Sequence, residues 1–329
     1  MWLKKVVTVG MILLGVYSCS VQPLIVRPFQ FSPAHMVGDK FMQVTLQGSL
    51  QLPSIKVGKD KLKIAGLSAL AWDEDEDILY AVSDSAKLFH LRPIFKENEL
   101  VDVKFLQAFW LRNPTGKRYS YHDTEGLAIR HGNNGVKGDS ELIISFERQP
   151  RIVSFTPLGV QKGLAYLPEE LRIISHYQND NKMLEAVMLH PQFGTITTSE
   201  YPLRINNERE IVLYNLTGQR WTLPRYFAKN SAVVALEPME DGSILILERA
   251  FVSPMEPVII SLRNVRLNTD GSTSKVRLVS VFDSSQGWAV DNFEGMSHHR
   301  KNFFFIISDN NDLSVQRTLL NYIEVQTRH

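Results

Sequence analysis

Short runs of apolar residues, rich in Val, Ile, Leu and Phe, recur along most of this chain. They are separated by turns rich in Gly, Asp, Asn and Pro, and the regular spacing of an amphipathic helix is almost absent. Runs of this length and composition are typical of strands. The pattern therefore predicts an all-β fold.

One two-strand unit occurs five times. Its first strand is expected over residues 66–71, 123–129, 183–189, 231–236 and 292–296, and its second over residues 78–84, 142–147, 194–200, 244–248 and 303–309. The unit returns at intervals of about 50 to 60 residues, somewhat longer than a compact four-stranded propeller blade needs. A β-sandwich also has many short strands, but it does not explain the regular return of one unit. The repeat therefore predicts a single β-propeller.

Further strand candidates complete the blades. They cover residues 151–156 and 171–176 in the second repeat and residues 258–262 and 276–281 in the fourth. After the fifth unit only residues 319–325 remain, so the missing strand is expected from residues 41–46. Pairing the two ends of the chain in one blade removes exposed sheet edges. This predicts five blades; a sixth blade, built from divergent strands between residues 47 and 63, is the alternative.

Acidic residues recur at the ends of these strands. The innermost strand of each propeller blade lines the central channel, so equivalent positions form a ring. The first strands begin with Ser68, Glu125, Glu185 and Glu294, and the second strands end with Asp84, Glu147, Glu200, Glu248 and Asp309. Because the two strands are antiparallel, we expect both sets at the same mouth of the channel.

Clustered carboxylates repel one another unless a cation, an arginine or a proton offsets the repulsion. Arg148 and Arg249 each follow one of these acids directly, and a guanidinium can pair with a carboxylate or a phosphate through two bonds. Calcium, which accepts six to eight oxygen ligands, suits the same acids. The alternative is that each acid caps a blade turn through backbone N–H groups. The glycines after Glu125 and Glu294 are expected to allow a close backbone approach at the channel.

Histidines are the weaker candidates. His122 and the pair His298 and His299 have the chemistry of a general base or a metal ligand, or they are structural residues of the surface or core. The sequence holds no nucleophile elbow, Walker loop, dinucleotide fingerprint or zinc-protease helix.

The first 40 residues predict export and a lipid anchor. Two lysines precede an apolar run over residues 6–16, as in a signal peptide. Residues 16–19, Val-Tyr-Ser-Cys, resemble the lipobox of bacterial lipoproteins, in which the cysteine is lipidated and becomes the new N-terminus. We therefore expect a signal peptide over residues 1–18, lipidation of Cys19, a tether over residues 19–40 and the propeller over residues 41–329. Ser20 favours the outer membrane, with the protein facing the periplasm. The alternative is an ordinary signal peptide with an incidental cysteine.

Charge and cysteine content narrow the remaining choices. The formal net charge of 329 residues is +1, and removal of residues 1–18, which hold two lysines and no acid, changes it to −1. A nearly neutral surface does not favour nucleic acid. Cys19 is the sole cysteine, so an internal disulfide and a cysteine-based zinc site are excluded. We expect a monomer that contacts the membrane through its N-terminal lipid.

Several of these segments resemble the phytase-like family, also described as esterase-like activity of phytase. The segments are residues 67–70 with 80–84, residues 123–128, residues 145–147 with 150–152, residues 245–251, and residues 292–296 leading to 308–310. Together they extend over most of the chain after the tether. The resemblance implies an exported propeller related to calcium-dependent phytases, which cleave phosphate esters.

The resemblance also implies roles for the acids. It suggests catalytic roles for Glu125, Glu185 and Glu294, metal binding by Asp84, Glu147, Glu200 and Asp309, and substrate binding by Arg148, Arg249, Glu248 and His122, with calcium as the cofactor. The chain departs from the pattern at two places: Ala186 stands after Glu185 where glycine is expected, and Val234 stands where an acid is expected. Either a pocket opens beside the fourth blade or catalysis has been lost.

Two functions therefore remain open. The first is a calcium-dependent hydrolase of small phosphoesters or esters at an acidic channel mouth. The second is a non-catalytic propeller that binds an envelope component or serves as a scaffold.

Overall fold

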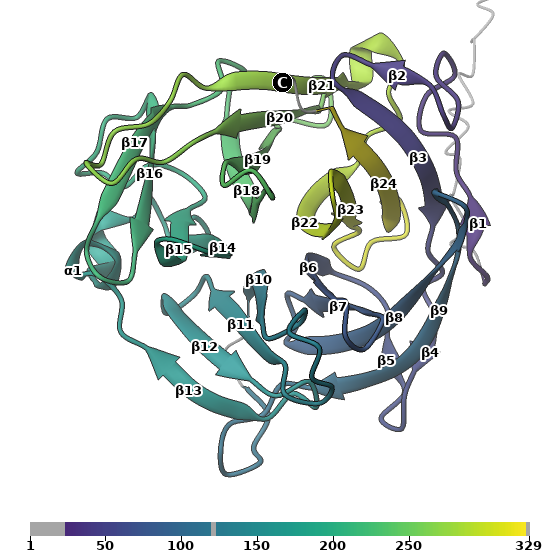
Figure 1. The fold of residues 1–329 in the computed structure, drawn as a ribbon, viewed down its shortest axis with the longest axis horizontal. Coiled ribbons are helices and arrows are strands. Elements are labelled where there is room, and N and C mark those ends of the chain that lie inside the picture. The colour runs from purple at the N-terminus through teal and green to yellow at the C-terminus, as the bar shows by residue number, and fades with distance from the viewer. Residues whose placement is uncertain (1–23, 120–122, 327–329) are drawn as a thin grey trace, which may run out of the picture.

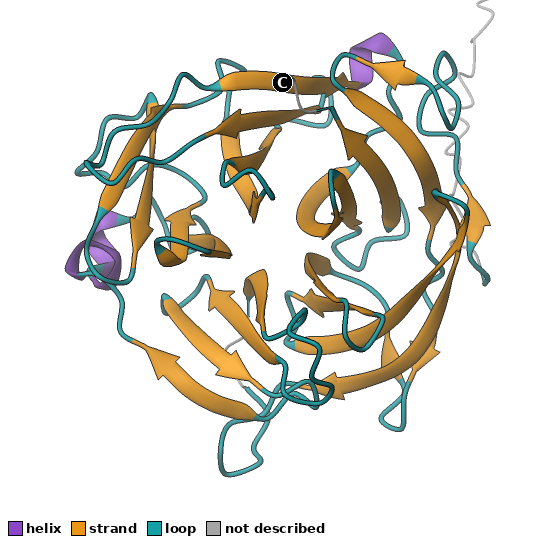
Figure 2. Ribbon diagram, viewed as in Figure 1, coloured by secondary structure: helices purple, strands orange, loops and turns teal. Residues whose placement is uncertain are grey.

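Five antiparallel sheets stand around a common axis (Figure 1). The structure is a computed structural model that describes residues 24–119 and 123–326. The first four blades are the sheets β6-β7-β8-β9, β10-β11-β12-β13, β14-β15-β16-β17 and β18-β19-β20-β21, each ordered from the axis outward. The prediction of a five-bladed propeller is confirmed, and strands make up nearly all of its regular structure (Figure 2).

The strands of the first two blades are β6 (Leu67–Asp73), β7 (Ile78–Ser83), β8 (Lys87–Lys96), β9 (Glu99–Trp110), β10 (Thr124–Arg130), β11 (Glu141–Phe146), β12 (Arg151–Phe155) and β13 (Gln161–Ala165). Those of the third and fourth are β14 (Leu184–His190), β15 (Gly194–Ser199), β16 (Glu210–Asn215), β17 (Arg220–Pro224), β18 (Ser231–Pro238), β19 (Ile244–Ala250), β20 (Ile259–Val265) and β21 (Arg277–Asp283).

The fifth blade joins the two ends of the chain, as the sequence predicted. Its inner strands are β22 (Asn292–Arg300), β23 (Phe303–Asp309) and β24 (Leu319–Val325), and its outer strand is β3 (Val44–Gln51). β3 is antiparallel to β24, with Leu50 opposite Leu320 and Val44 opposite Val325. The short strands β1 (Arg27–Pro28) and β2 (Lys40–Phe41) pair with β3 from outside. This pairing closes the ring of blades.

Two predicted elements differ in the structure. Within the described residues, the segment proposed for a sixth blade contributes the end of β3 and a hairpin of β4 (Lys56–Val57) and β5 (Leu62–Lys63). Residues 171–176 form no strand but lie in α1 (Glu169–Arg172) and η1 (Ile174–His176). The fourth strand of the second blade is β13, which comes earlier in the chain. Leu171 lies on the helix and its side chain is fully buried in the core. This apolar segment therefore contributes to the core without forming a strand.

Part of the expected tether packs on the propeller. Phe31 is 5% exposed and contacts the rings of Phe282, Trp288 and Phe293. His35 stacks on Trp288 with 5.1 Å between ring centroids. Residues 27–41 thus follow the fifth blade because their aromatic side chains cover its apolar edge. The predicted signal peptide and Cys19 lie outside the described residues.

Apolar side chains fill the spaces between neighbouring blades. Leu67, Leu79 and Phe89 of the first blade share one cluster with Phe305 and Tyr322 of the fifth. The remaining clusters likewise combine residues of adjacent blades. Among the described residues, no helix is both long and apolar enough to span a bilayer. The packing holds the five innermost strands at fixed positions around the axis.

Candidate functional site: an acidic mouth of the central channel

The innermost strand of every blade is interrupted at the same place. The pairing with the second strand shifts register at β6, β10, β14, β18 and β22. A bulge of this kind bends the strand locally and re-aims the side chain that it carries. The residues at the five bulges are Ser68, Glu125, Glu185, Val234 and Glu294. The repeat found in the sequence is therefore a repeat of one backbone irregularity.

A second set of side chains comes from the second strands at the same end. The residues opposite the strand starts are Asp84, Glu147, Glu200, Arg249 and Asp309, one from each blade. Backbone hydrogen bonds tie these positions to the first strands and to the next blade. The N–H of Glu147 donates to Asp123 (2.9 Å), and the N–H of Asp123 donates to Asp84 (2.8 Å). The ring is thus fixed by the backbone.

The assignment of Glu248 to this ring is wrong. Glu248 pairs with Val233 and the following residue, Arg249, pairs with Ala232, which places Arg249 at the ring position. Adjacent residues of a strand point to opposite faces. The Glu248 side chain is fully buried on the other face, where it accepts hydrogen bonds from the Arg263 guanidinium and the Tyr226 N–H (3.1 Å). It is a structural carboxylate and is not placed to contact a substrate at the mouth.

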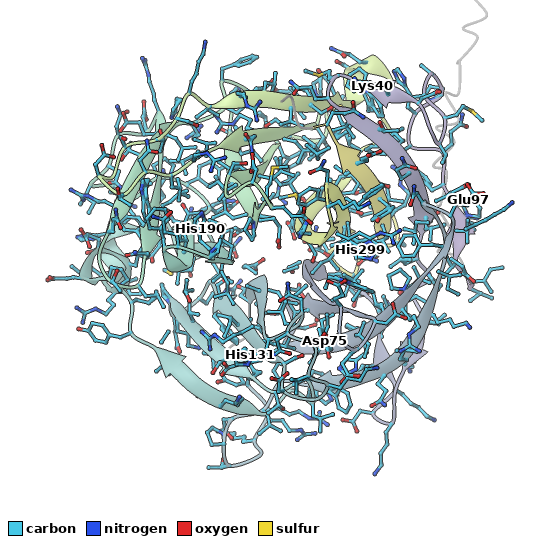
Figure 3. All side chains as sticks on the ribbon, viewed as in Figure 1. Lys40, Asp75, Glu97, His131, His190 and His299 are labelled. Atoms are coloured by element: carbon cyan, nitrogen blue, oxygen red, sulfur yellow. The ribbon has the colours of Figure 1, made fainter. Side chains whose placement is uncertain are left out.

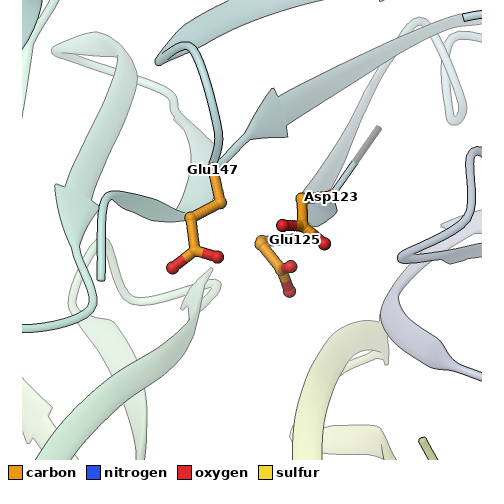
Figure 4. Close-up of side chains that lie close together, drawn as sticks. All are labelled: Asp123, Glu125 and Glu147. Atoms are coloured by element: carbon orange, nitrogen blue, oxygen red, sulfur yellow. The ribbon is translucent and has the colours of Figure 1, made fainter. Parts of the chain in front are cut away.

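Five carboxylates converge in two overlapping groups. Ligand oxygens of Asp123, Glu125 and Glu147 all lie within 4.8 Å of one another (Figure 4). Oxygens of Glu147, Glu185 and Glu200 satisfy the same limit. Glu147 belongs to both groups and is the one residue that they have in common. We call the whole cluster the acidic mouth; it comprises Asp84, Asp123, Glu125, Glu147, Glu185, Glu200, Glu294 and Asp309.

The glycines beside two of these acids serve the close approach expected from the sequence. A Cβ atom on Gly126 would lie 2.6 Å from the carbonyl oxygen of Glu185 and 2.7 Å from the backbone nitrogen of Val187. A Cβ atom on Gly295 would lie 2.8 Å from the Cα of Ala69. Both contacts are with the backbone of a neighbouring blade. Glycine at these positions therefore sets how closely the acidic strands approach the axis.

Among the residues that the structure describes, three cations contact the acidic mouth. Arg249 bonds to Glu294 and Asn292 through Nη1, and its Nη2 lies 3.3 Å from Glu200. Lys182 Nζ lies 2.7 Å from Glu200, and Arg148 Nε lies 2.6 Å from Asp123. The Arg249 side chain is 13% exposed, whereas that of Arg148 is 56% exposed. Arg249 is thus part of the cluster, and Arg148 stands at its rim.

Burial and mutual repulsion favour the neutral forms of these acids. The pKa values of Glu125 and Glu185 lie well above 4.5, first because both groups are desolvated and second because neighbouring carboxylates repel their charge. Burial raises the pKa of Glu147 to about 8. Burial, reinforced by the neighbouring Glu294, raises the pKa of Asp309 to about 9. The cluster holds eight carboxyl groups and contacts three cations among the described residues, so protons or a further cation must offset the remaining repulsion.

The donor set fits a hard divalent cation. Calcium binds carboxylate oxygens at 2.3–2.6 Å, so two of its ligand oxygens lie up to about 5 Å apart. The 4.8 Å limit within each group of three matches this span. Three carboxylates leave further coordination positions for water or a substrate oxygen, because calcium takes six to eight ligands. The residues present therefore fit calcium, and an ion would offset the repulsion that raises their pKa values.

The structure gathers most of the predicted site residues and separates others. Seven predicted acids lie at the acidic mouth, while His298 and His299 lie at the other end of β22. His122 lies outside the described residues. At the fourth blade, Val234 is buried and Arg249 occupies the ring position instead of an acid. The fourth blade thus contributes no acid from its first strand, as the sequence indicated, and contributes a cation from its second strand, where the sequence assigned Glu248.

Sequence reasoning missed Asp123 and Lys182 as site residues. Asp123 precedes Glu125 by two positions, a spacing that places two side chains on the same face of a strand. Lys182 carries no such signal, because it lies in the turn before β14 and meets Glu200 only through the fold.

A comparison with protein families supports the resemblance noted in the sequence. The family model described as phytase-like, esterase-like activity of phytase, matches residues 62–312. This range includes four complete blades, the first two strands of the fifth and every acid of the acidic mouth. No curated protein matches the chain.

Proposed function

Because the chain belongs to the family described as esterase-like activity of phytase, we propose that it is a calcium-dependent hydrolase of phosphoesters or carboxylic esters acting at the acidic mouth. The observation that carries this proposal is the pair of carboxylate groups that share Glu147. An acidic cluster with more carboxyl groups than cations binds either protons or a further cation, and ester hydrolysis is a reaction that a metal cation in this position promotes.

The residues divide into three roles. Asp123, Glu125, Glu147, Glu185 and Glu200 are the oxygen donors for calcium. Calcium bound there would acidify a water molecule and neutralise charge on the oxygens of the reacting ester. Arg249 holds Glu200 and Glu294 in place from within the cluster. Arg148, which is largely exposed, supplies a guanidinium at the rim for a phosphate oxygen.

The partial exposure of Glu125 suggests that the carboxylate oxygen that it does not offer to calcium accepts a proton during the reaction. Its carboxylate belongs to the first group of three, yet its side chain is only half-buried. A general base must be within reach of the water that it deprotonates, and its pKa should be near the working pH. Burial, reinforced by the neighbouring carboxylates, raises the pKa of Glu125 above its ordinary value, which makes the group a stronger base than a free glutamate.

The test is hydrolysis of p-nitrophenyl phosphate and p-nitrophenyl acetate by the chelator-treated full chain, with and without added calcium. We expect calcium-dependent release of nitrophenol, and loss of this release in Glu125→Gln and Glu294→Gln. Glu169→Gln, an exposed acid in the first turn of α1, is the matched control and should retain activity. Calcium binding without turnover on either ester would instead support the non-catalytic binding propeller.

We further propose export and anchoring through a lipid on Cys19, with the propeller in the periplasm at the outer membrane. The basis is the lysine-containing start, the apolar run and the Val-Tyr-Ser-Cys segment. Several acyl chains on one residue would give stable attachment. Cells grown with labelled palmitate should label the wild-type chain and not Cys19→Ser, and fractionation should find the labelled chain in the outer membrane. Equal labelling of both chains would contradict the proposal.

A further inference from the structure

A second pocket lies at the opposite end of the central channel. It has a volume of about 320 Å³, at the lower end of the range for small-molecule sites. Each blade lines it with the far end of its innermost strand, including Trp72 of β6, Ile129 of β10, Leu189 of β14, Glu237 of β18 and His298 of β22. We call it the far mouth.

The far mouth is separate from the acidic mouth. Trp72 follows Ser68 by four residues on β6, a rise of about 13 Å along a strand. Between the two levels, apolar residues such as Leu127, Val234 and Met296 line a space of about 10 Å³. That volume corresponds to about one water-sized probe. A ligand at one mouth therefore does not reach the other through the channel.

The charge of the far mouth has one sign. The charged residues among those that line it are Glu74 and Glu237; its other lining residues are apolar, amide, hydroxyl or histidine. Burial lowers the pKa of His299 to about 3, with Arg300 contributing, so this imidazole is neutral. Its Nδ1 is occupied by the Tyr322 hydroxyl at 2.6 Å. Apart from His298, the described part of the pocket wall thus provides no group that carries a positive charge.

Glu237 is the most unusual of these residues. Burial raises its pKa to about 8, and the interaction that opposes this is a single hydrogen bond from the backbone N–H of His298. Glu200 and Glu248, by contrast, are paired with Lys182 and Arg263. A desolvated carboxylate without a counter-ion is costly in a folded protein. A cationic ligand would remove this cost.

The indole of Trp72 adds a second feature that a cationic ligand can use. Its ring meets that of His299 edge to face, with 4.6 Å between centroids. The face of a tryptophan ring attracts ammonium groups. Ile129 and Leu189 provide apolar surface for the carbon chain of such a ligand.

We propose that the far mouth is a binding site for a small aliphatic amine, with a primary ammonium group against Glu237 and the Trp72 ring and its carbon chain against Ile129 and Leu189. A diamine fits the charge best, because Glu74 at the exposed rim offers a second carboxylate. This site does not depend on the proposed hydrolase activity, because its residues are distinct from those of the acidic mouth.

The test is calorimetric titration of the full chain with putrescine, compared with butane-1,4-diol, which has the same carbon chain and no charge. We expect binding of putrescine and no binding of the diol. Glu237→Gln should weaken putrescine binding at least tenfold, because it removes the charge and keeps the shape. Glu240→Gln, an exposed acid two residues beyond the lining Pro238, is the matched control and should bind as the wild type does.

Two further variants distinguish putrescine binding at the far mouth from binding at the acidic mouth. Glu147→Gln alters the acidic mouth and should leave putrescine binding unchanged. Trp72→Phe should weaken binding even if Glu237→Gln fails to fold, because the smaller ring offers a weaker face to the ammonium group. The proposal is overturned if putrescine does not bind, if the diol binds equally well, or if Glu147→Gln abolishes binding while Glu237→Gln does not.

Discussion

Removing the guanidinium of Arg249 should destabilise the propeller unless calcium is present. Arg249 is 13% exposed and contacts Glu294, Glu200 and Asn292. In Arg249→Gln two mostly buried carboxylates lose this cation, although Lys182 still contacts Glu200. Breaking a buried ion pair by removing one partner costs about 3 to 5 kcal/mol. At an unfolding entropy of about 2.1 cal/mol/K per residue, for about 300 residues, the loss corresponds to a fall of about 5 to 8 °C in Tm.

The assay is thermal unfolding at neutral pH, followed by circular dichroism, in chelator and in millimolar calcium. Calcium should raise the Tm of Arg249→Gln by more than that of the wild type, because the ion replaces part of the lost positive charge. The control is Arg266→Gln, which breaks an exposed pair with Asp241 and should change stability by less than about 1 kcal/mol. If Arg249→Gln has the same Tm as the wild type in both solutions, the Arg249 guanidinium does not stabilise the buried carboxylates and the electrostatic account fails.

Three further predictions concern the same architecture. In chelator, the free energy of unfolding should fall as pH rises from about 4.5 to about 9. Burial raises the pKa of Glu147 to about 8 and that of Asp309 to about 9, so over this range the folded chain holds protons that the unfolded chain has lost. Constant or rising stability in thermal unfolding across this range would refute the prediction. Gly126→Ala should lower the free energy of unfolding in urea by roughly 1 to 3 kcal/mol, because its Cβ would meet backbone atoms of the third blade. Gly163→Ala, whose Cβ would lie 3.1 Å from the Ser154 hydroxyl, should lower it by less. Equal losses in the two variants would argue against the close approach. Truncation before β24 should abolish the near-ultraviolet circular dichroism of the folded chain, because β24 joins β23 to β3; a native spectrum would show that closure is dispensable.

The strand repeat and the closure of the ring were accessible from the sequence because they depend on local patterns. The runs at residues 303–309 and 319–325 are apolar and β-branched or aromatic, and such runs predict strands without knowledge of the fold. The run at residues 171–176 shows the limit of this reasoning. It is also apolar, but it follows Pro168 and two glutamates that favour a helix start, and it buries Leu171 from that helix.

The acidic mouth was predicted in outline, with one error of register. Glu248 and Arg249 are neighbours in sequence, and a shift of one residue moves a strand side chain to the other face. The bulge in β18 determines which of the two reaches the axis, and bulges are not visible in a hydrophobic pattern. The contact of Lys182 with Glu200 also arises only in the fold. Position on a strand was therefore predictable, whereas the direction of each side chain and its distant partners were not.

The central claim is that the carboxylates around Glu147 bind a divalent cation. The most direct test is calorimetric titration of the chelator-treated full chain with calcium, repeated with Glu147→Gln. We predict calcium binding by the wild type, with a large loss of affinity in the variant, because Glu147 belongs to both groups of three. An absence of calcium binding by the folded wild-type chain, or equal binding by Glu147→Gln, would contradict the account.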